Sequence, residues 1–171
     1  MHRAFAYLVK TRCLDPKVVS VFARRHMIYE DAKYHNAVFV GFDVDGIPRH
    51  AHKRGTCQRG KPFKGNVESC DPRYSFHWIG KSDTVYVFEA PIDMLSFISM
   101  YQKDWMGHSY VALCGVAEHA LVQLLEDVPH LSKITLCLDH DKAGIEAGER
   151  IKNGCLSGDT EMCSRFFLSE G

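Results

Sequence analysis

Short apolar strands that alternate with helices constrain the second half of this chain more than any other feature. Three segments have the continuous apolar character of strands buried on both faces, namely residues 84–88, 109–114 and 134–138. Segments with helical apolar periodicity follow them, at residues 91–102, in a stretch ending at residue 128, and at residues 142–153. Strands and helices in this order form a parallel sheet covered by helices. An α/β fold is therefore predicted, with residues 166–168 beginning a fourth strand.

The first half of the chain has a different pattern. Asp15 and Pro16 supply a helix cap and a proline at the first helical position, so helices are expected over residues 2–10 and 16–25. Asp45-Gly46 is a hairpin-turn signal between two expected strands, residues 37–42 and 47–52. The polar residues that follow, rich in Gly and Pro, predict a loop over residues 53–72 before another strand at residues 74–79.

These patterns divide the chain into a helical segment (residues 1–36), a small basic β lobe (residues 37–80) and an α/β domain (residues 81–171). Residues 1–80 contain 14 Lys and Arg against 7 Asp and Glu, whereas residues 81–171 contain 7 against 14. A basic half joined to an acidic half favours one surface for polyanions and another for cations, the alternative being an uneven distribution of surface charge.

The composition indicates in which cellular compartment the protein is expected. No apolar run approaches the roughly 18–20 residues that span a bilayer, so no membrane partner is expected. Seven cysteines, an odd number without a C-x-x-C pair, favour reduced thiols over a disulfide framework or a zinc finger. A cytoplasmic protein is the resulting expectation.

Three carboxylates follow the ends of two strands. Glu89 comes directly after residues 84–88, and Asp139 and Asp141 come directly after residues 134–138. Because ligands of α/β sheets bind at the carboxyl ends of the strands, these side chains converge if the strands are neighbours. Close carboxylates repel one another, and Mg²⁺ relieves that repulsion while binding substrate phosphates. The alternative is that Glu89 and Asp139 cap the helices that follow.

Residues 87–96 (VFEAPIDMLS) and residues 138–144 (LDHDKAG) together resemble the Toprim domain, which is shared by bacterial primases, topoisomerases and some nucleases. The second motif is most similar to the DnaG-type primase branch. Residues 6–12 resemble the helical entry of the primase catalytic core, and residues 42–65 resemble the basic lobe of primase-like proteins carried on plasmids and mobile elements. The resemblance implies a Rossmann-like Toprim sheet flanked by helices and preceded by a small helical and β lobe.

Several roles follow from that resemblance. Glu89, Asp139 and Asp141 are expected to bind Mg²⁺ or Mn²⁺ and to be catalytic. Asp93 and Ser96 are expected to support them from the next helix. Gly144 at a helix start would let phosphate approach backbone N–H groups. Relatives carry a further Lys-Asp-Trp-Asn segment after the last strand, which this sequence lacks.

A basic segment precedes the acidic motifs. It contains no acid between residues 49 and 64, and its glycines let backbone approach a nucleic-acid strand. Residues expected to contact single-stranded DNA or nucleoside triphosphates are Arg49, Lys53, Arg54, Arg59, Lys61 and Lys64, with Lys142 from the second Toprim-like motif. Arg54 and Lys64 are the strongest candidates. A solvated basic loop is the alternative.

Three functional hypotheses remain at this point. The favoured one is Mg²⁺-dependent, primase-like nucleotidyl transfer on a single-stranded DNA template, with a helicase or another replication protein as a further partner. The second is a metal-dependent nuclease that uses the same ions. The third, supported by the absent Lys-Asp-Trp-Asn segment, is a catalytically inactive DNA-binding module of a mobile-element replication protein.

Two other signals are weaker. Asp43-x-Asp45-Gly46 is similar to the signature of haloacid-dehalogenase-type phosphatases, but an Asp-Gly turn into a short strand favours a hairpin. His50 and His52 share one face of a strand without a visible third ligand. Nucleic-acid contact or solvent exposure is therefore expected for them rather than zinc binding.

Overall fold

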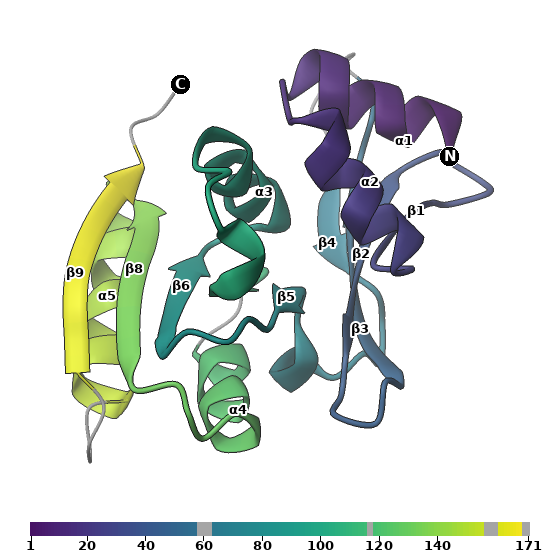
Figure 1. The fold of residues 1–171 in the computed structure, drawn as a ribbon. Coiled ribbons are helices and arrows are strands. Elements are labelled where there is room, and N and C mark those ends of the chain that lie inside the picture. Colours follow the sequence, from purple (N-terminus) through teal and green to yellow (C-terminus); the bar gives the residue numbers. More distant parts are fainter. Residues whose placement is uncertain (58–62, 116–117, 156–160, 169–171) are drawn as a thin grey trace.

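The computed structural model describes residues 1–57, 63–115, 118–155 and 161–168. Within these ranges the chain forms one four-stranded sheet and one five-stranded sheet. Figure 1 shows the smaller sheet beside the N-terminal helices and the larger sheet ending at the C-terminal strand. No helix in the described ranges combines the length and the apolar content that crossing a bilayer requires.

The smaller sheet is antiparallel throughout. In spatial order it contains β1 (Ile28–Glu30), β2 (Ala37–Phe42), β3 (Pro48–Arg54) and β4 (Lys64–Asn66). The predicted hairpin between β2 and β3 is confirmed. Gly46 has the positive φ of 75° that the turn requires, and Asp43 accepts hydrogen bonds from the backbone of Asp45 and Ile47. Since this return is antiparallel, the phosphatase interpretation is wrong.

The prediction of a loop over residues 53–72 is wrong in two places. Lys53 and Arg54 extend β3, and residues 64–66 form β4. β4 has the sequence KGN, with no apolar alternation, and it is ordered by pairing with β3. Strand formation at such a position depends on the neighbouring strand more than on local sequence, so the residues themselves give no signal.

The larger sheet follows the predicted alternation. In spatial order it contains β5 (His77–Trp78), β7 (Ser109–Ala112), β6 (Thr84–Phe88), β8 (Lys133–Asp139) and β9 (Glu161–Leu168). All pairs are parallel except that of β5 with β7. The helices between the parallel strands are α3 (Pro91–Met100), α4 (His119–Asp127) and α5 (Lys142–Cys155). The parallel α/β fold is confirmed.

The N-terminal segment is helical as predicted, with one irregularity. It contains α1 (His2–Ala6), the π-helical turn η1 (Tyr7–Thr11) and α2 (Pro16–Arg24). The Asp15 carboxylate accepts hydrogen bonds from the backbone N–H groups of Lys17 and Val18 at 2.7 and 3.1 Å, so the predicted cap is confirmed. Short 3₁₀ turns lie at η2 (Pro72–Tyr74) and η3 (Trp105–Gly107).

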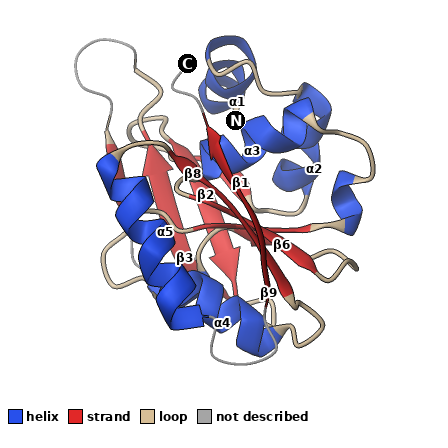
Figure 2. Ribbon diagram, turned by 90° about the vertical axis from the view of Figure 1, so that its left-hand side faces the viewer, coloured by secondary structure: helices blue, strands red, loops and turns tan. Residues whose placement is uncertain are grey.

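Apolar clusters cover both faces of the larger sheet. Val85 and Val87 of β6 face the cluster that includes residues of α4 and α5, whereas Phe88 faces the cluster that includes residues of α2 and α3. Figure 2 shows α4 and α5 on one side and α1 to α3 on the other. The second cluster continues into the smaller sheet through Phe39 of β2, whose ring lies 5.5 Å from that of Phe76. Because this core crosses residue 80, the predicted domain boundary stays a prediction.

The histidines of β3 differ from expectation. His50 and His52 share a face, but they are only 2% and 3% exposed, so the expected solvent exposure is wrong. Residues 67–71 run beside β3, with hydrogen bonds from Val67 N–H to the Ala51 carbonyl and from Asp71 N–H to the Arg49 carbonyl. His52 is also the cross-strand partner of Phe39, a residue of the buried core, so the face of β3 that carries both histidines points toward that core.

His50 makes the stability of the fold depend on pH. Burial lowers its pKa from 6.5 to about 4, and neither ring nitrogen has a hydrogen-bond partner among the described residues. The unfolded chain therefore takes up a proton at a higher pH than the folded chain. The stability contributed by neutral His50 is complete above pH 6.5 and is lost as pH falls toward 4. Between pH 7 and pH 5 we expect a loss of roughly 2 kcal/mol through this residue.

Urea denaturation at both pH values measures this effect. Between pH 7 and pH 5, the free energy of unfolding should fall by roughly 2 kcal/mol less in His50→Leu than in the unmodified protein. An equal fall in the two proteins would contradict the assignment.

Candidate active site

Neighbouring strands bring Glu89 and Asp139 together. β6 and β8 pair in parallel with Phe88 opposite Cys137, so both strands end at the same edge of the sheet. The Glu89 carboxylate oxygen Oε1 accepts a hydrogen bond from the Asp139 backbone N–H at 3.3 Å. The condition on which the sequence prediction depended, that these strands are adjacent, is therefore met.

The helix-capping alternative is wrong for Glu89, and the acid that caps α5 is Asp141. Ala90 occupies the N-cap position of α3 without a side-chain hydrogen bond, and Glu89 reaches across to β8 instead. Asp141 Oδ1 accepts a hydrogen bond from the Gly144 backbone N–H at 2.8 Å, as an N-cap residue does. Asp141 thus fixes the start of α5 next to the other two carboxylates.

Burial and mutual repulsion act on the acidic groups at this edge. Burial raises the pKa of Glu89, and the nearby Asp139 carboxylate raises it further. Burial and Asp139 also raise the pKa of Asp93 on α3, while Arg12, Lys64 and Arg54 oppose that rise. We call the sheet edge that carries Glu89, Asp139 and Asp141 the acidic edge. Asp93 is influenced both by this edge, through Asp139, and by a group of cationic side chains.

Gly144 is the point of closest packing between α5 and the acidic edge. A Cβ atom at this position would collide with the backbone carbonyl oxygen of Asp139 and would lie 2.7 Å from Glu89 Oε1. Only glycine lets the helix start approach Glu89 this closely. Ser96 lies half-buried on α3, one turn after Asp93.

The donor set fits a hard divalent cation. Carboxylate oxygens are the ligands that Mg²⁺ prefers, and a bound cation would offset the repulsion that raises the pKa of Glu89. In the part of the chain that the structure describes, no three His, Cys, Asp or Glu side chains are already gathered as a metal cluster. Mg²⁺ takes only one or two protein carboxylates in many phosphate-binding sites, so Glu89 and Asp139 would meet that requirement.

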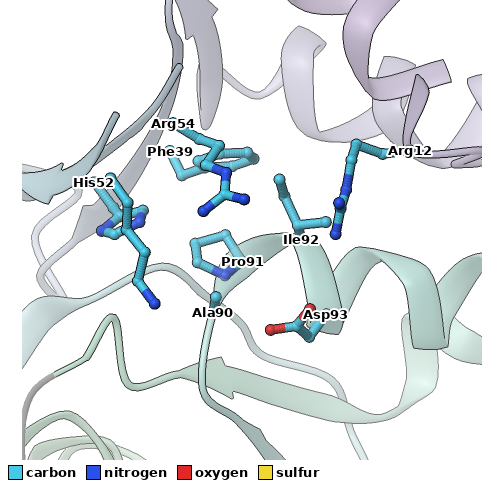
Figure 3. A pocket seen from close by; sticks show the side chains of 9 residues that line it. Arg12, Phe39, His52, Arg54, Ala90, Pro91, Ile92 and Asp93 are labelled. Atoms are coloured by element: carbon cyan, nitrogen blue, oxygen red, sulfur yellow. The ribbon is translucent and has the colours of Figure 1, made fainter. Parts of the chain in front are cut away.

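A cavity of about 180 Å³ lies between the smaller sheet and the start of α3. Figure 3 shows the guanidinium groups of Arg12 and Arg54 extending into this space, with the Asp93 carboxylate on the side of α3. His52 and Phe39 lie on the side of the smaller sheet. Its lining residues are Arg12, Phe39, His52, Arg54, Lys64, Ala90, Pro91, Ile92 and Asp93. We call this space the basic cavity.

Two cations face each other in the wall of the basic cavity. Arg54 and Lys64 are directly opposite in the pairing of β3 with β4, an arrangement that destabilises a sheet when both side chains are charged. The Nε atom of Arg54 is buried and has no hydrogen-bond partner among the described residues. An anion in the cavity would reduce the repulsion between the two cations and would offer the buried Arg54 Nε atom a hydrogen-bond partner.

The other predicted basic residues that the structure describes lie elsewhere. Alternation along β3 turns Arg49 and Lys53 away from Arg54, and Arg49 forms an ion pair with Asp43 at 2.6 Å. Lys142 is largely exposed and lies 3.9 Å from Glu146 on the same helix. The expected contacts of Arg59 and Lys61 concern residues outside the described ranges.

The structure adds Arg12 and His52, which were not among the predicted site residues. Arg12 follows η1 and is far from the basic segment in sequence, so only the tertiary fold brings it to the cavity. The position of His52 could have been predicted from the sequence, because strand alternation places it on the same face as Arg54.

Two family models match separate parts of the chain. A family described as Toprim-like matches residues 86–166, and a family described as a protein of unknown function, DUF3991, matches residues 6–82. The uncharacterized protein pXO2-78 of Bacillus anthracis is 26% identical over 162 residues, which cover 87% of this chain and 46% of that protein. The chain thus spans about half the length of this curated relative.

Solved structures with a similar fold are primase cores. The primase fragment of the bacteriophage T7 primase-helicase protein has a TM-score of 0.65 and 16% identity, covering 90% of this chain and 62% of that one. The Aquifex aeolicus primase has a TM-score of 0.62 and 17% identity, covering 95% and 49%. The DnaG primase catalytic domain bound to ssDNA has a TM-score of 0.62 and 13% identity, covering 99% and 65%.

Proposed function

We propose that the protein performs Mg²⁺-dependent, primase-like nucleotidyl transfer on single-stranded DNA, from the premise that residues 86–166 match a Toprim-like family. The reaction joins the 3′-hydroxyl of a growing primer to the α-phosphate of a nucleoside triphosphate and releases pyrophosphate. The observation that carries the proposal is the position of Asp93, which lines the basic cavity together with Arg12, Arg54 and Lys64 and is close enough to Asp139 for that carboxylate to raise its pKa. A substrate that binds the cations of the basic cavity and also reaches the acidic edge would have its phosphates beside the carboxylates.

Each group has a distinct role in this proposal. Glu89, Asp139 and Asp141 would hold Mg²⁺ or Mn²⁺. The bound ion supplies activation of the primer hydroxyl and neutralises charge on the triphosphate. Arg12, Arg54 and Lys64 would bind phosphate oxygens by charge-assisted hydrogen bonds and thereby orient the nucleotide. Ser96 and Asp93 would hold the acidic edge from α3.

A product assay tests the proposal and separates it from its alternatives. The protein is incubated with a single-stranded template, four ribonucleotides and Mg²⁺ or Mn²⁺, and the products are resolved on a gel. Extension products are the expected result. Shortened template would support a metal-dependent nuclease instead, and unchanged DNA that still binds the protein would support an inactive binding module. A helicase partner is part of the same proposal, because the T7 relative is a primase-helicase protein.

Arg54→Ala and Lys64→Ala are expected to weaken binding of single-stranded DNA at low salt. Each variant should also reduce the slope of log affinity against log salt concentration by about 1, because one phosphate contact is lost. Fluorescence anisotropy with a labelled oligonucleotide at several salt concentrations measures both quantities. Lys152→Ala, an exposed cation on α5, is the matched control and should leave the slope unchanged. Equal slopes in all four proteins would remove the basic cavity from the binding surface.

A further inference from the structure

His52 is a polar side chain in the wall of the basic cavity that the proposed mechanism does not use. It is 3% exposed, and its ring nitrogen Nδ1 lies 2.7 Å from the Asn66 side-chain oxygen Oδ1 on β4. The two residues are direct partners in the pairing of β3 with β4. Figure 3 shows the ring on the side of the cavity formed by the smaller sheet.

A chain of hydrogen bonds determines where the imidazole carries its proton. The Asn66 amide nitrogen Nδ2 donates to the backbone carbonyl of Cys114 at 3.4 Å. Since that carbonyl can only accept, the Asn66 oxygen must face His52. An amide oxygen also only accepts, so Nδ1 of His52 must carry a hydrogen. In the neutral ring, Nε2 is then a lone-pair acceptor.

The charged groups around His52 oppose a second proton on the ring as long as no anion is bound. Arg54 lies on the same face of β3, Lys64 is opposite Arg54 on β4, and Arg12 approaches from the N-terminal segment. Burial lowers the pKa of His52, and Lys64 and Arg54 lower it further, while the Asn66 hydrogen bond opposes them. Asp93 on α3 is the acid among the residues that line the cavity.

A bound phosphate would instead favour protonation of the His52 ring. Phosphate oxygens would neutralise the three cations, and they would repel the lone pair of a neutral Nε2. Protonation of Nε2 turns that repulsion into a charge-assisted hydrogen bond. The proton comes from solvent: an N–H bond forms at Nε2 as an O–H bond of hydronium breaks, and the covalent bonds of the phosphate are unchanged.

We propose that His52 is a proton-linked phosphate ligand, so that the phosphates of a nucleoside triphosphate enter the basic cavity together with one proton on Nε2. This inference rests on the proposed function, because it assumes that the cavity binds the nucleotide. The nucleotide is the ligand assigned to His52 because β3, β4 and α3 enclose the space and the acidic edge adjoins it, whereas Arg54 and Lys64 would also contact phosphates of the template strand.

NMR titration of the His52 ring tests the inference directly. The Cε1–H signal of His52, assigned with His52→Gln, is followed against pH in the free protein and in protein saturated with ATP. The midpoint of the titration is expected to rise by about one pH unit with ATP, equivalent to a tenfold tighter hold on the proton. His130, an exposed histidine before β8, is the internal control, and its midpoint should not move.

A second variant distinguishes proton linkage from a purely structural role. In Asn66→Asp, a carboxylate would face Nδ1 and stabilise the protonated ring. The midpoint of the free variant should then already be raised, and the increase caused by ATP should be smaller. An Asn66→Asp midpoint equal to that of the unmodified protein would contradict the hydrogen-bond chain.

The outcomes separate the two proposals. If ATP binds and the His52 midpoint stays unchanged, the proton linkage is wrong and the proposed function stands. If ATP does not bind at all, both the nucleotide cavity and the linkage fail. If an oligonucleotide moves the midpoint while ATP does not, the cavity binds the DNA backbone and the assignment to a nucleotide is overturned.

Discussion

The double variant Glu89→Gln, Asp139→Asn is expected to lose at least about 100-fold of the Mg²⁺-dependent primer synthesis while remaining folded. Amide side chains keep the shape of the acids but bind divalent cations poorly. Because burial and repulsion from Asp139 raise the pKa of Glu89, removing both charges also relieves an unfavourable interaction. The melting temperature should therefore be equal to that of the unmodified protein or higher. Initial rates on a template gel and thermal denaturation measure the two effects.

A matched pair of substitutions controls for the loss of charge itself. Asp45 at the tip of the hairpin and Glu126 on α4 are exposed carboxylates away from the acidic edge. The double variant Asp45→Asn, Glu126→Gln should retain the full rate. A Glu89→Gln, Asp139→Asn protein with normal activity would dismiss the carboxylate mechanism.

Gly144→Ala is expected to damage both the site and the fold. The new methyl group would collide with the Asp139 carbonyl oxygen, a backbone atom that cannot rotate away, and would crowd Glu89 Oε1 at 2.7 Å. The start of α5 would have to shift away from β8, which separates Asp141 from the other two carboxylates. We expect a loss of about 1–3 kcal/mol in the free energy of unfolding, together with a fall in the synthesis rate comparable to that of the acid variants.

Gly154→Ala is the control within the same helix. Nothing lies within 4 Å of a Cβ atom at that position, and alanine is the better helix former. This variant should be as stable as the unmodified protein or more stable by up to about 1 kcal/mol, with unchanged activity. Urea denaturation compares the two substitutions. Equal effects of Gly144→Ala and Gly154→Ala would mean that close packing at Gly144 has no role.

The α/β half of the chain could be predicted because its signals are local and strong. Residues 84–88 and 134–138 are continuous apolar strands, and their pairing in the middle of the sheet agrees with their burial on both faces. Glu89 and Asp139 follow those strands directly, so the α/β topology was enough to bring them to one edge. Asp15-Pro16 and Asp45-Gly46 were equally local signals for a helix start and a turn.

The rest of the site depends on contacts that local sequence does not encode. β4 has no strand pattern of its own and exists because β3 pairs with it. That pairing places Lys64 opposite Arg54 and Asn66 opposite His52. Arg12 reaches the same cavity only through the packing of the N-terminal segment. The basic cavity therefore depends on tertiary contacts between distant segments, whereas the acidic edge follows from the order and direction of the strands.

The central claim is that Glu89 and Asp139 hold a divalent cation at the carboxyl ends of β6 and β8. A crystal soaked in Mn²⁺, with anomalous diffraction recorded to locate the ion, tests it most directly. We predict an anomalous peak between the two carboxylates, within coordinating distance of an oxygen from each. Ordered Glu89 and Asp139 side chains that turn away from each other, with no peak between them, would contradict the claim.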